Sequence, residues 1–148
     1  MESLESSAAT TREVLASAIA LHQRGQLEEA ESVYLGILEA DENNADALHY
    51  LGVMRHQQGR SLLAIDLVRR AIDIRPDYVD ALNNLGNIYQ QLGGPDDAAK
   101  AYKMALELRP DHPEALRNLA VALRKLKRFE ESLDAYQRAI EHEPGNVR

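Results

Sequence analysis

The chain has 148 residues, a formal net charge of -7 at pH 7 and no cysteine. That length suffices for one domain with its own core, whereas the acidic balance argues against nucleic acid as a partner and the lack of cysteine excludes disulfides and thiolate metal sites. The N-terminus is acidic and no apolar run is long enough to cross a bilayer, so we expect neither a secretory signal nor a membrane span and predict a cytoplasmic protein.

The sequence repeats itself at a 34-residue interval without a gap. The divergent first copy, "EVLASAIALHQRG", begins at Glu13, and the next copies are "ALHYLGVMRHQQG" from Ala47, "ALNNLGNIYQQLG" from Ala81 and "ALRNLAVALRKLK" from Ala115. A fixed period of this size indicates a solenoid of stacked repeats. In order, we therefore predict a lead-in (1–10), four repeats (11–44, 45–78, 79–112 and 113–146) and the start of a truncated fifth repeat (147–148).

Each repeat is predicted to fold as two antiparallel helices, because apolar residues recur on one face of each segment and helix pairs can bury such faces by stacking. Thr10, Asp77 and Asp111 are expected to cap the first helices of the first, third and fourth repeats. Pro95 suits the first turn of a second helix. The first helices of the first three repeats are expected to end at Gly25, Gly59 and Gly93.

Certain positions keep the same residue type in most of the repeats, with exceptions such as Ser17 at position seven and Glu42 at position thirty-two of the first repeat. Positions four, seven, eight, twenty and thirty-two of the third repeat hold Leu82, Leu85, Gly86, Ala98 and Pro110. This pattern resembles the tetratricopeptide repeat. The resemblance implies an all-α protein, an α-solenoid of four helix-turn-helix repeats in a right-handed superhelix whose concave face binds partner peptides. Arg55 departs from the pattern as an isolated charge at a core position, and we expect its long stem to reach solvent.

Positions five, six, nine, twelve and thirteen form a second face of each first helix, opposite the apolar stripe. In tetratricopeptide proteins these positions line the concave face, so the resemblance implies that they bind a peptide; the alternative is a merely solvated helix face. Amides in the third repeat suit a peptide backbone, and cations in the fourth favour an acidic end. The predicted peptide-binding residues are His49, Tyr50, Val53, His56, Asn83, Asn84, Asn87, Gln90, Gln91, Arg117, Asn118, Val121, Arg124 and Lys125.

Two subfamily patterns can be compared at these positions. Asn84 and Asn118 share position six, which is similar to the asparagine ladder of O-linked N-acetylglucosamine transferases, although Ala16 and Tyr50 stand there in the earlier repeats. The chaperone-tail clamp of other tetratricopeptide proteins has lysine at positions two and five, and this sequence lacks it. A chaperone-tail receptor is therefore disfavoured.

No constellation of residues indicates catalysis. His22 and His56 occupy equivalent positions of adjacent repeats, but neighbouring helix axes lie about 8–10 Å apart, which is long for two ligands of one metal ion. No Ser/His/Asp set or phosphate-binding loop is present. We predict no metal, no cofactor and no enzyme within these residues.

Three functions remain open. The first is a scaffold for protein interactions, binding an extended peptide or partner segment in the concave groove. The second is the N-terminal, substrate-recruiting arm of a larger bacterial glycosyl-, sulfo- or methyltransferase, because the sequence stops where a fifth repeat would begin and we expect a fragment of a longer protein. The third is a structural module that self-associates as a homodimer through the unfinished end of the fourth repeat, where Leu133, Tyr136 and Ile140 would lack part of their next neighbour. The apolar patch of Leu15 and Ile19 is the other surface expected to stack between copies.

Overall fold

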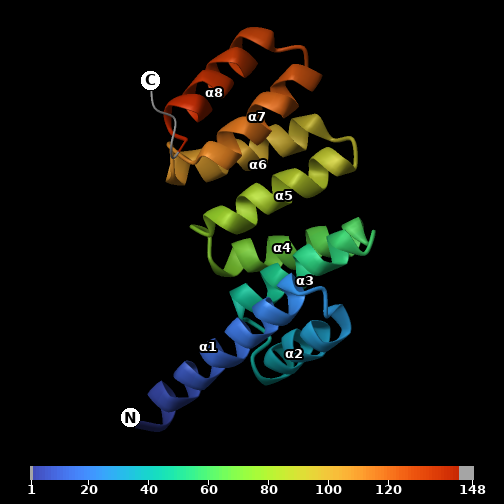
Figure 1. Cartoon of the computed structure of the whole chain (residues 1–148), viewed down its shortest axis with the longest axis vertical. Coiled ribbons are helices and arrows are strands. Elements are labelled where there is room, and N and C mark those ends of the chain that lie inside the picture. The colour runs from blue at the N-terminus through green and yellow to red at the C-terminus, as the bar shows by residue number, and fades with distance from the viewer. Residues whose placement is uncertain (1, 144–148) are drawn as a thin grey trace. The chain divides into compact units, whose positions relative to one another are not determined.

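A computed structural model describes residues 2–143, and the side chains of residues 10–143. Within residues 2–143 the chain forms eight helices and no strand, which confirms the predicted all-α class (Figure 1). The predicted start of a fifth repeat, 147–148, lies outside the described residues. The helices are α1 (Glu2–Gln23), α2 (Leu27–Ala40), α3 (Ala45–Gln57), α4 (Ser61–Ile74), α5 (Val79–Gln91), α6 (Pro95–Leu108), α7 (Pro113–Lys125) and α8 (Phe129–Glu141).

The chain divides into two compact units, a first unit of residues 1–75 and a second unit of residues 76–148. In the first unit, α2 packs against α1 and α3, and α4 packs against α3. In the second unit, α6 packs against α5 and α7, and α8 packs against α7. Within each unit, therefore, one helix pair covers the apolar face of the next, as the repeat pattern predicts.

All four first helices are followed by a residue in the left-handed backbone region. Gly25, Gly59 and Gly93 have φ of 80°, 79° and 78°, which confirms the predicted glycine ends. Lys127 takes the same place in the last helix pair with φ 62°. This conformation costs a residue with a Cβ roughly 1–2 kcal/mol.

One tyrosine organises the core of each unit. Tyr34 of α2 is fully buried beside Ala18 and Ala30, and Leu51 and Met54 of α3 pack on the same cluster. Such side chains supply much of the apolar burial that holds three helices together.

Tyr102 of α6 has the corresponding place in the second unit and is also fully buried. A Cβ added at Gly86 of α5 would lie 2.7 Å from Cδ1 and Cζ of the Tyr102 ring. Leu116 and Leu119 of α7 complete this cluster. The glycine is therefore what lets α5 lie directly on the ring of Tyr102.

The predicted caps at Thr10, Asp77 and Asp111 are wrong. Thr10 lies inside α1, because the residues before it include no proline or glycine and the helix continues to Glu2. At the later helices the cap falls one residue after each aspartate. Tyr78 precedes α5 without a side-chain cap bond, and Nδ1 of His112 accepts from the backbone N–H of Ala115 (3.2 Å).

The same position caps α3. Oδ1 of Asn44 accepts from the backbone N–H of Ala47 at 2.9 Å. Asn44, Tyr78 and His112 are 34 residues apart, so the cap position follows the repeat even though its chemistry changes.

Arg55 of α3 is not the isolated charge that the sequence predicts. Its guanidinium Nη2 lies 2.8 Å from Oε1 of Glu31 in α2, and Nη1 donates to Oε1 of Gln58 at 2.9 Å. The bond from Arg55 holds the pKa of Glu31 below its usual value. The ion pair thus joins α2 to α3 at a position where the family pattern places a tyrosine.

Candidate functional site

The predicted binding residues fall into two groups. The α3 group (His49, Tyr50, Val53 and His56) belongs to the first unit. The α5/α7 face (Asn83, Asn84, Asn87, Gln90, Gln91, Arg117, Asn118, Val121, Arg124 and Lys125) belongs to the second unit. Each group is described within its own unit.

Exposure differs widely among these residues. His49 and Asn83 are only 2% and 3% exposed, so the prediction that they face away from the core is wrong for these two. The remaining members of the α3 group are partly buried. Gln91, Arg117, Arg124 and Lys125 are exposed. Helical periodicity places all of these residues on one face, but it does not show how far a neighbouring helix covers that face.

Hydrogen bonds connect the amides of the α5/α7 face to one another and to the core. Nδ2 of Asn118 donates to Oδ1 of Asn83 at 3.3 Å. Nε2 of Gln90 donates to the backbone oxygen of Asn118 at 3.3 Å and to the hydroxyl oxygen of Tyr102 at 3.4 Å. The Tyr102 hydroxyl donates in turn to Oδ1 of Asn87 at 2.6 Å. Amides from two neighbouring helices therefore form one continuous network.

Two features of this network bear on binding. Burial raises the pKa of Tyr102 to about 12, so its hydroxyl stays neutral and remains a donor at any physiological pH. Oε1 of Gln90 is buried and has no hydrogen-bond partner among the described residues. A buried acceptor without a donor is uncommon and costs free energy. Because this oxygen is buried, a partner's N–H could reach it only after the side chain of Gln90 moved.

The α3 group lies next to a related arrangement in the first unit. Nδ1 of His22 lies 3.3 Å from the hydroxyl of Tyr34, and Nε2 lies 2.6 Å from Oε1 of Gln57. Because an amide oxygen can only accept, Nε2 of His22 is the donor in the bond to Gln57. The Tyr34 ring stacks on Tyr50 with centroids 6.2 Å apart and planes 7° apart. Burial raises the pKa of Tyr34 to about 12.

His56 has no tyrosine to bond, because Val68 replaces it at the equivalent place in α4. Its Nδ1 lies 3.2 Å from Oγ of Ser61 instead. Burial lowers the pKa of His56, which favours the neutral imidazole. Within the described part of the chain, no three His, Asp or Glu side chains gather as a metal site would require.

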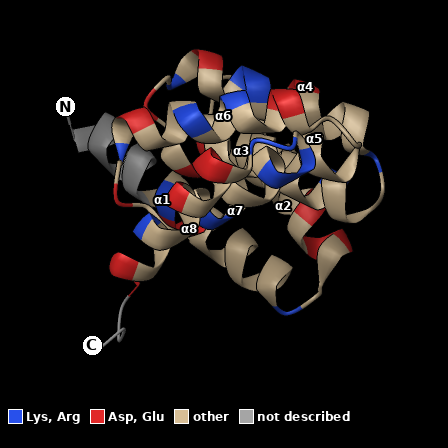
Figure 2. Cartoon of the chain, turned by 90° about the horizontal axis from the view of Figure 1, so that it is seen from above, with Lys and Arg blue, Asp and Glu red and all other residues tan. Residues whose placement is uncertain are grey.

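Cationic side chains lie along α7 on the α5/α7 face. Arg117 forms an ion pair with Glu143. Arg124 and Lys125 are exposed and make no ion pair with any of the described residues. Figure 2 shows charges of both signs on most of the helices, whereas α2 carries acidic side chains and no lysine or arginine. The last turn of α7 is therefore a place where an anionic group could be bound without displacing an internal partner.

Sequence reasoning missed the two tyrosines that anchor these networks. Tyr34 and Tyr102 are core residues, yet each hydroxyl also bonds a first-helix side chain twelve residues before it, His22 and Gln90 respectively. The signal was available: a polar residue at position twelve together with tyrosine at position twenty-four of the same repeat.

None of the described helices is both long enough and apolar enough to cross a membrane. The antiparallel helix pairs, each packed on the next within its unit, define the class of all-α repeat solenoids. Two models of the tetratricopeptide repeat match residues 45–111 and 83–147. The chain belongs to the tetratricopeptide repeat family, whose repeats are in general non-catalytic modules for protein interaction.

Solved structures share this fold. One crystal structure of MamA superimposes with a TM-score of 0.81 at 23% identity, covering 95% of this chain and 82% of that chain. A second MamA structure gives 0.79 at 23% identity, covering 94% and 76%. A mutant O-GlcNAc transferase from Thermobaculum terrenum gives 0.79 at 31% identity, covering 88% of this chain but 26% of that chain. No curated protein matches the sequence significantly.

Proposed function

We propose that this protein is an interaction scaffold that binds an extended peptide or partner segment on the first-helix faces of its repeats. The repeats would be 11–44, 45–78, 79–112 and 113–146, with the accessible members of the α3 group and of the α5/α7 face as the binding residues. His49 and Asn83 are buried and would support these faces without contacting the partner. The observation that carries the proposal is the amide network, in which Gln90, Asn118 and Asn83 connect two neighbouring helices. A row of fixed donors and acceptors matches the repeating N–H and C=O groups of an extended backbone.

The network also fixes the geometry of the binding face before any partner arrives. Asn87 and Gln90 are both held by the Tyr102 hydroxyl, so few side-chain rotamers need be lost on binding. The exposed Gln91, Arg124 and Lys125 border these amides and supply groups that distinguish one peptide from another. We propose a partner segment with a carboxylate or acidic residue opposite Arg124 and Lys125.

Screening a displayed peptide library against the immobilised chain tests this proposal. Peptides that are retained would be titrated by calorimetry against the wild-type chain and against the double variant Asn84→Ala/Asn118→Ala. Weaker binding by the double variant is the expected result. If every retained peptide binds both proteins equally, the first-helix faces are not the binding site.

A second candidate function is the substrate-recruiting arm of a larger transferase. It is favoured by the similarity to the O-GlcNAc transferase, in which the matched part is about a quarter of that chain. Reading the gene beyond codon 148 tests this candidate. An open frame that encodes a transferase domain supports it, and a stop codon soon after Arg148 refutes it.

A third candidate is self-association as a homodimer through the last helix pair. Leu133 and Ile140 of α8 are 60% and 44% exposed, so this helix presents an apolar surface. Light scattering over a range of protein concentrations tests it. A mass that rises to that of a dimer supports self-association, whereas a monomer at the highest concentration refutes it.

A further inference from the structure

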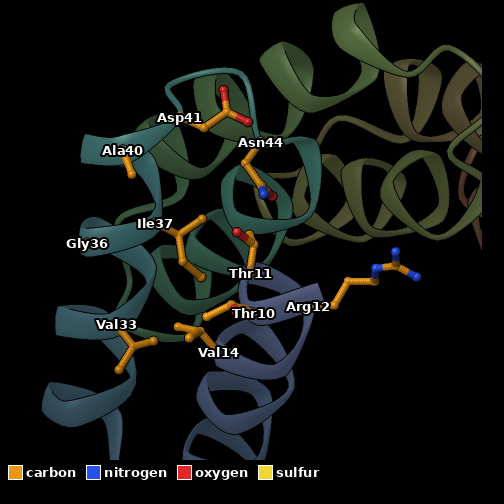
Figure 3. A pocket seen from close by; sticks show the side chains of 10 residues that line it. All are labelled: Thr10, Thr11, Arg12, Val14, Val33, Gly36, Ile37, Ala40, Asp41 and Asn44. Carbon is orange, nitrogen blue, oxygen red and sulfur yellow. The ribbon is translucent and has the colours of Figure 1, made fainter. Parts of the chain in front are cut away.

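A cleft opens in the first unit between the N-terminal part of α1 and the C-terminal half of α2, with a volume of about 790 Å³. Figure 3 shows Val14 of α1 facing Val33 and Ile37 of α2 across it. Gly36 and Ala40 leave the α2 wall open between these side chains. A space of this size is within the range of about 300–1,000 Å³ that bound ligands commonly fill.

Three of the residues that line the cleft are smaller than their equivalents in the later repeats. Val14 stands where the later repeats have leucines, and Gly36 stands where they have arginine or methionine. Ala40 stands where they have isoleucine, leucine or histidine. The equivalents of Val14 are Leu48, Leu82 and Leu116. Those of Gly36 are Arg70, Met104 and Arg138, and those of Ala40 are Ile74, Leu108 and His142.

The glycine serves no internal packing need. A Cβ added at Gly36 would meet nothing within 4 Å, in contrast to Gly52, where it would lie 2.6 Å from Cγ2 of Val68. A glycine inside a helix costs roughly 0.5–1 kcal/mol relative to alanine. The sequence therefore gives up helix stability at Gly36 and obtains open space in return.

Acidic side chains are concentrated on α2 and the turn that follows it. Asp41 lines the cleft, and Glu39 and Glu42 are close to it in sequence, whereas Glu28 and Glu29 lie at the other end of α2. Residues 27–43 include six acidic residues and no lysine or arginine. Glu31 is paired with Arg55. The other five are exposed: Glu28, Glu29, Glu39, Asp41 and Glu42. Arg12 is part of the cleft lining, but its guanidinium points away from the apolar interior (Figure 3).

We infer that this cleft binds a cationic amphipathic helix of a partner protein, with large aliphatic side chains between Val14, Val33 and Ile37 and with lysines or arginines facing Glu39, Asp41 and Glu42. The apolar lining selects the aliphatic side chains, and the unbalanced negative charge selects the sign of the flanking residues. This site lies in the first unit and does not depend on the α5/α7 face. A second copy of the chain fits less well, because the exposed Leu133 and Ile140 of α8 are flanked by acidic residues that the cleft would repel.

Two synthetic helical peptides test the inference: one of leucine and lysine in amphipathic order, and one with glutamate in place of each lysine. Fluorescence anisotropy would measure their binding to the wild-type chain, to Gly36→Met and to Ser32→Met. Gly36→Met fills the cleft with the residue that the third repeat carries, and it raises helix propensity, so the variant is expected to fold. Ser32→Met adds the same side chain to an exposed site of α2 outside the cleft.

The lysine peptide is expected to bind the wild-type chain and Ser32→Met equally, and to bind Gly36→Met about tenfold more weakly or worse. The glutamate peptide is expected not to bind. The inference is overturned if the lysine peptide binds Gly36→Met as tightly as it binds the wild-type chain. It is also overturned if the lysine peptide binds none of the three proteins. It is likewise overturned if light scattering shows a wild-type dimer that Gly36→Met abolishes, since the occupant would then be a second copy.

Discussion

The side-chain amide of Gln90 in α5 donates a hydrogen bond to the backbone oxygen of Asn118 in α7, at 3.3 Å. This bond joins two helices that belong to successive repeats, on the face to which binding is assigned. The same amide nitrogen also reaches the hydroxyl of Tyr102, which ties the face to the core of its own repeat. The α5/α7 face, where we propose that a partner binds, is thus built on the same contacts that hold the repeats together.

Replacing Tyr102 by phenylalanine removes the hydroxyl that both Asn87 and Gln90 contact. We expect Tyr102→Phe to lower the free energy of unfolding by about 1–2 kcal/mol, because partners of a lost buried hydrogen bond remain buried. Urea denaturation followed by circular dichroism measures this. Tyr136→Phe is the matched control at the equivalent position of the last repeat, and equal losses in the two variants would show that the network contributes nothing.

The two helical glycines Gly86 and Gly36 should respond in opposite directions to alanine. Gly86→Ala forces a Cβ against the Tyr102 ring and is expected to destabilise the fold by about 1–3 kcal/mol. Gly36→Ala meets open space and should stabilise it by up to about 1 kcal/mol through helix propensity. Thermal denaturation of both variants checks the pair of signs, and two changes of the same sign would contradict the packing described for one of these positions.

Lys127 adopts a left-handed conformation at a turn where the other repeats have glycine. Lys127→Gly removes the strain from the folded chain, which stabilises it. Glycine also raises the conformational entropy of the unfolded chain, which offsets part of that stabilisation, so we expect the free energy of unfolding to rise by about 0.5–1 kcal/mol. Lys100→Gly, inside α6, is expected to cost about 1 kcal/mol. The midpoint of thermal unfolding should therefore rise for the first variant and fall for the second; a fall in both would count against the strain at Lys127.

The Glu31–Arg55 ion pair should make stability depend on pH in the acid range. The ordinary pKa of a glutamate is 4.5, and in the folded chain the hydrogen bond from Arg55 lowers the pKa of Glu31 below that value. The unfolded chain therefore binds a proton at Glu31 more readily than the folded chain does. The stabilisation is complete above about pH 4.5 and is lost as pH falls through the lower pKa of the folded state. Glu31→Gln should be less stable than wild type at pH 7, with the difference shrinking toward pH 3.

Urea denaturation at several pH values measures that difference. Glu39→Gln, at an exposed position of the same helix, should differ little from wild type at any of them. A constant gap between Glu31→Gln and wild type from pH 7 to pH 3 would mean that the ion pair does not set the pKa of Glu31.

Much of the fold could be predicted because it is encoded locally and repeated. The glycine turns at Gly25, Gly59 and Gly93 and the close approach at Gly86 follow from residue types at fixed positions. The predicted caps at Asp77 and Asp111 were misplaced by one residue, because aspartate is a good capping residue and each precedes the observed cap position. The cap predicted at Thr10 was wrong for another reason, since α1 continues to Glu2.

What escaped prediction depends on residues that are distant in sequence. Asn83 is buried and bonded to Asn118, 35 residues away, and helical periodicity carries no information about such a neighbour. The partner of Arg55 is likewise 24 residues upstream, on another helix. The proposed binding face could be outlined from helical periodicity, but not divided into residues that hold the repeats together and residues that remain exposed.

The central claim is that the α5/α7 face binds a peptide. Charge reversal at Arg124 and Lys125, which are exposed and form no ion pair with any described residue, tests this claim most directly. A retained peptide with an acidic end would be titrated by calorimetry against wild type, Arg124→Glu/Lys125→Glu and the control Lys100→Glu/Lys103→Glu, which makes the same charge change on exposed residues of α6. We predict a loss of affinity of about tenfold or more for the first variant and little change for the control. Equal affinity in all three proteins would contradict the assignment of the binding face.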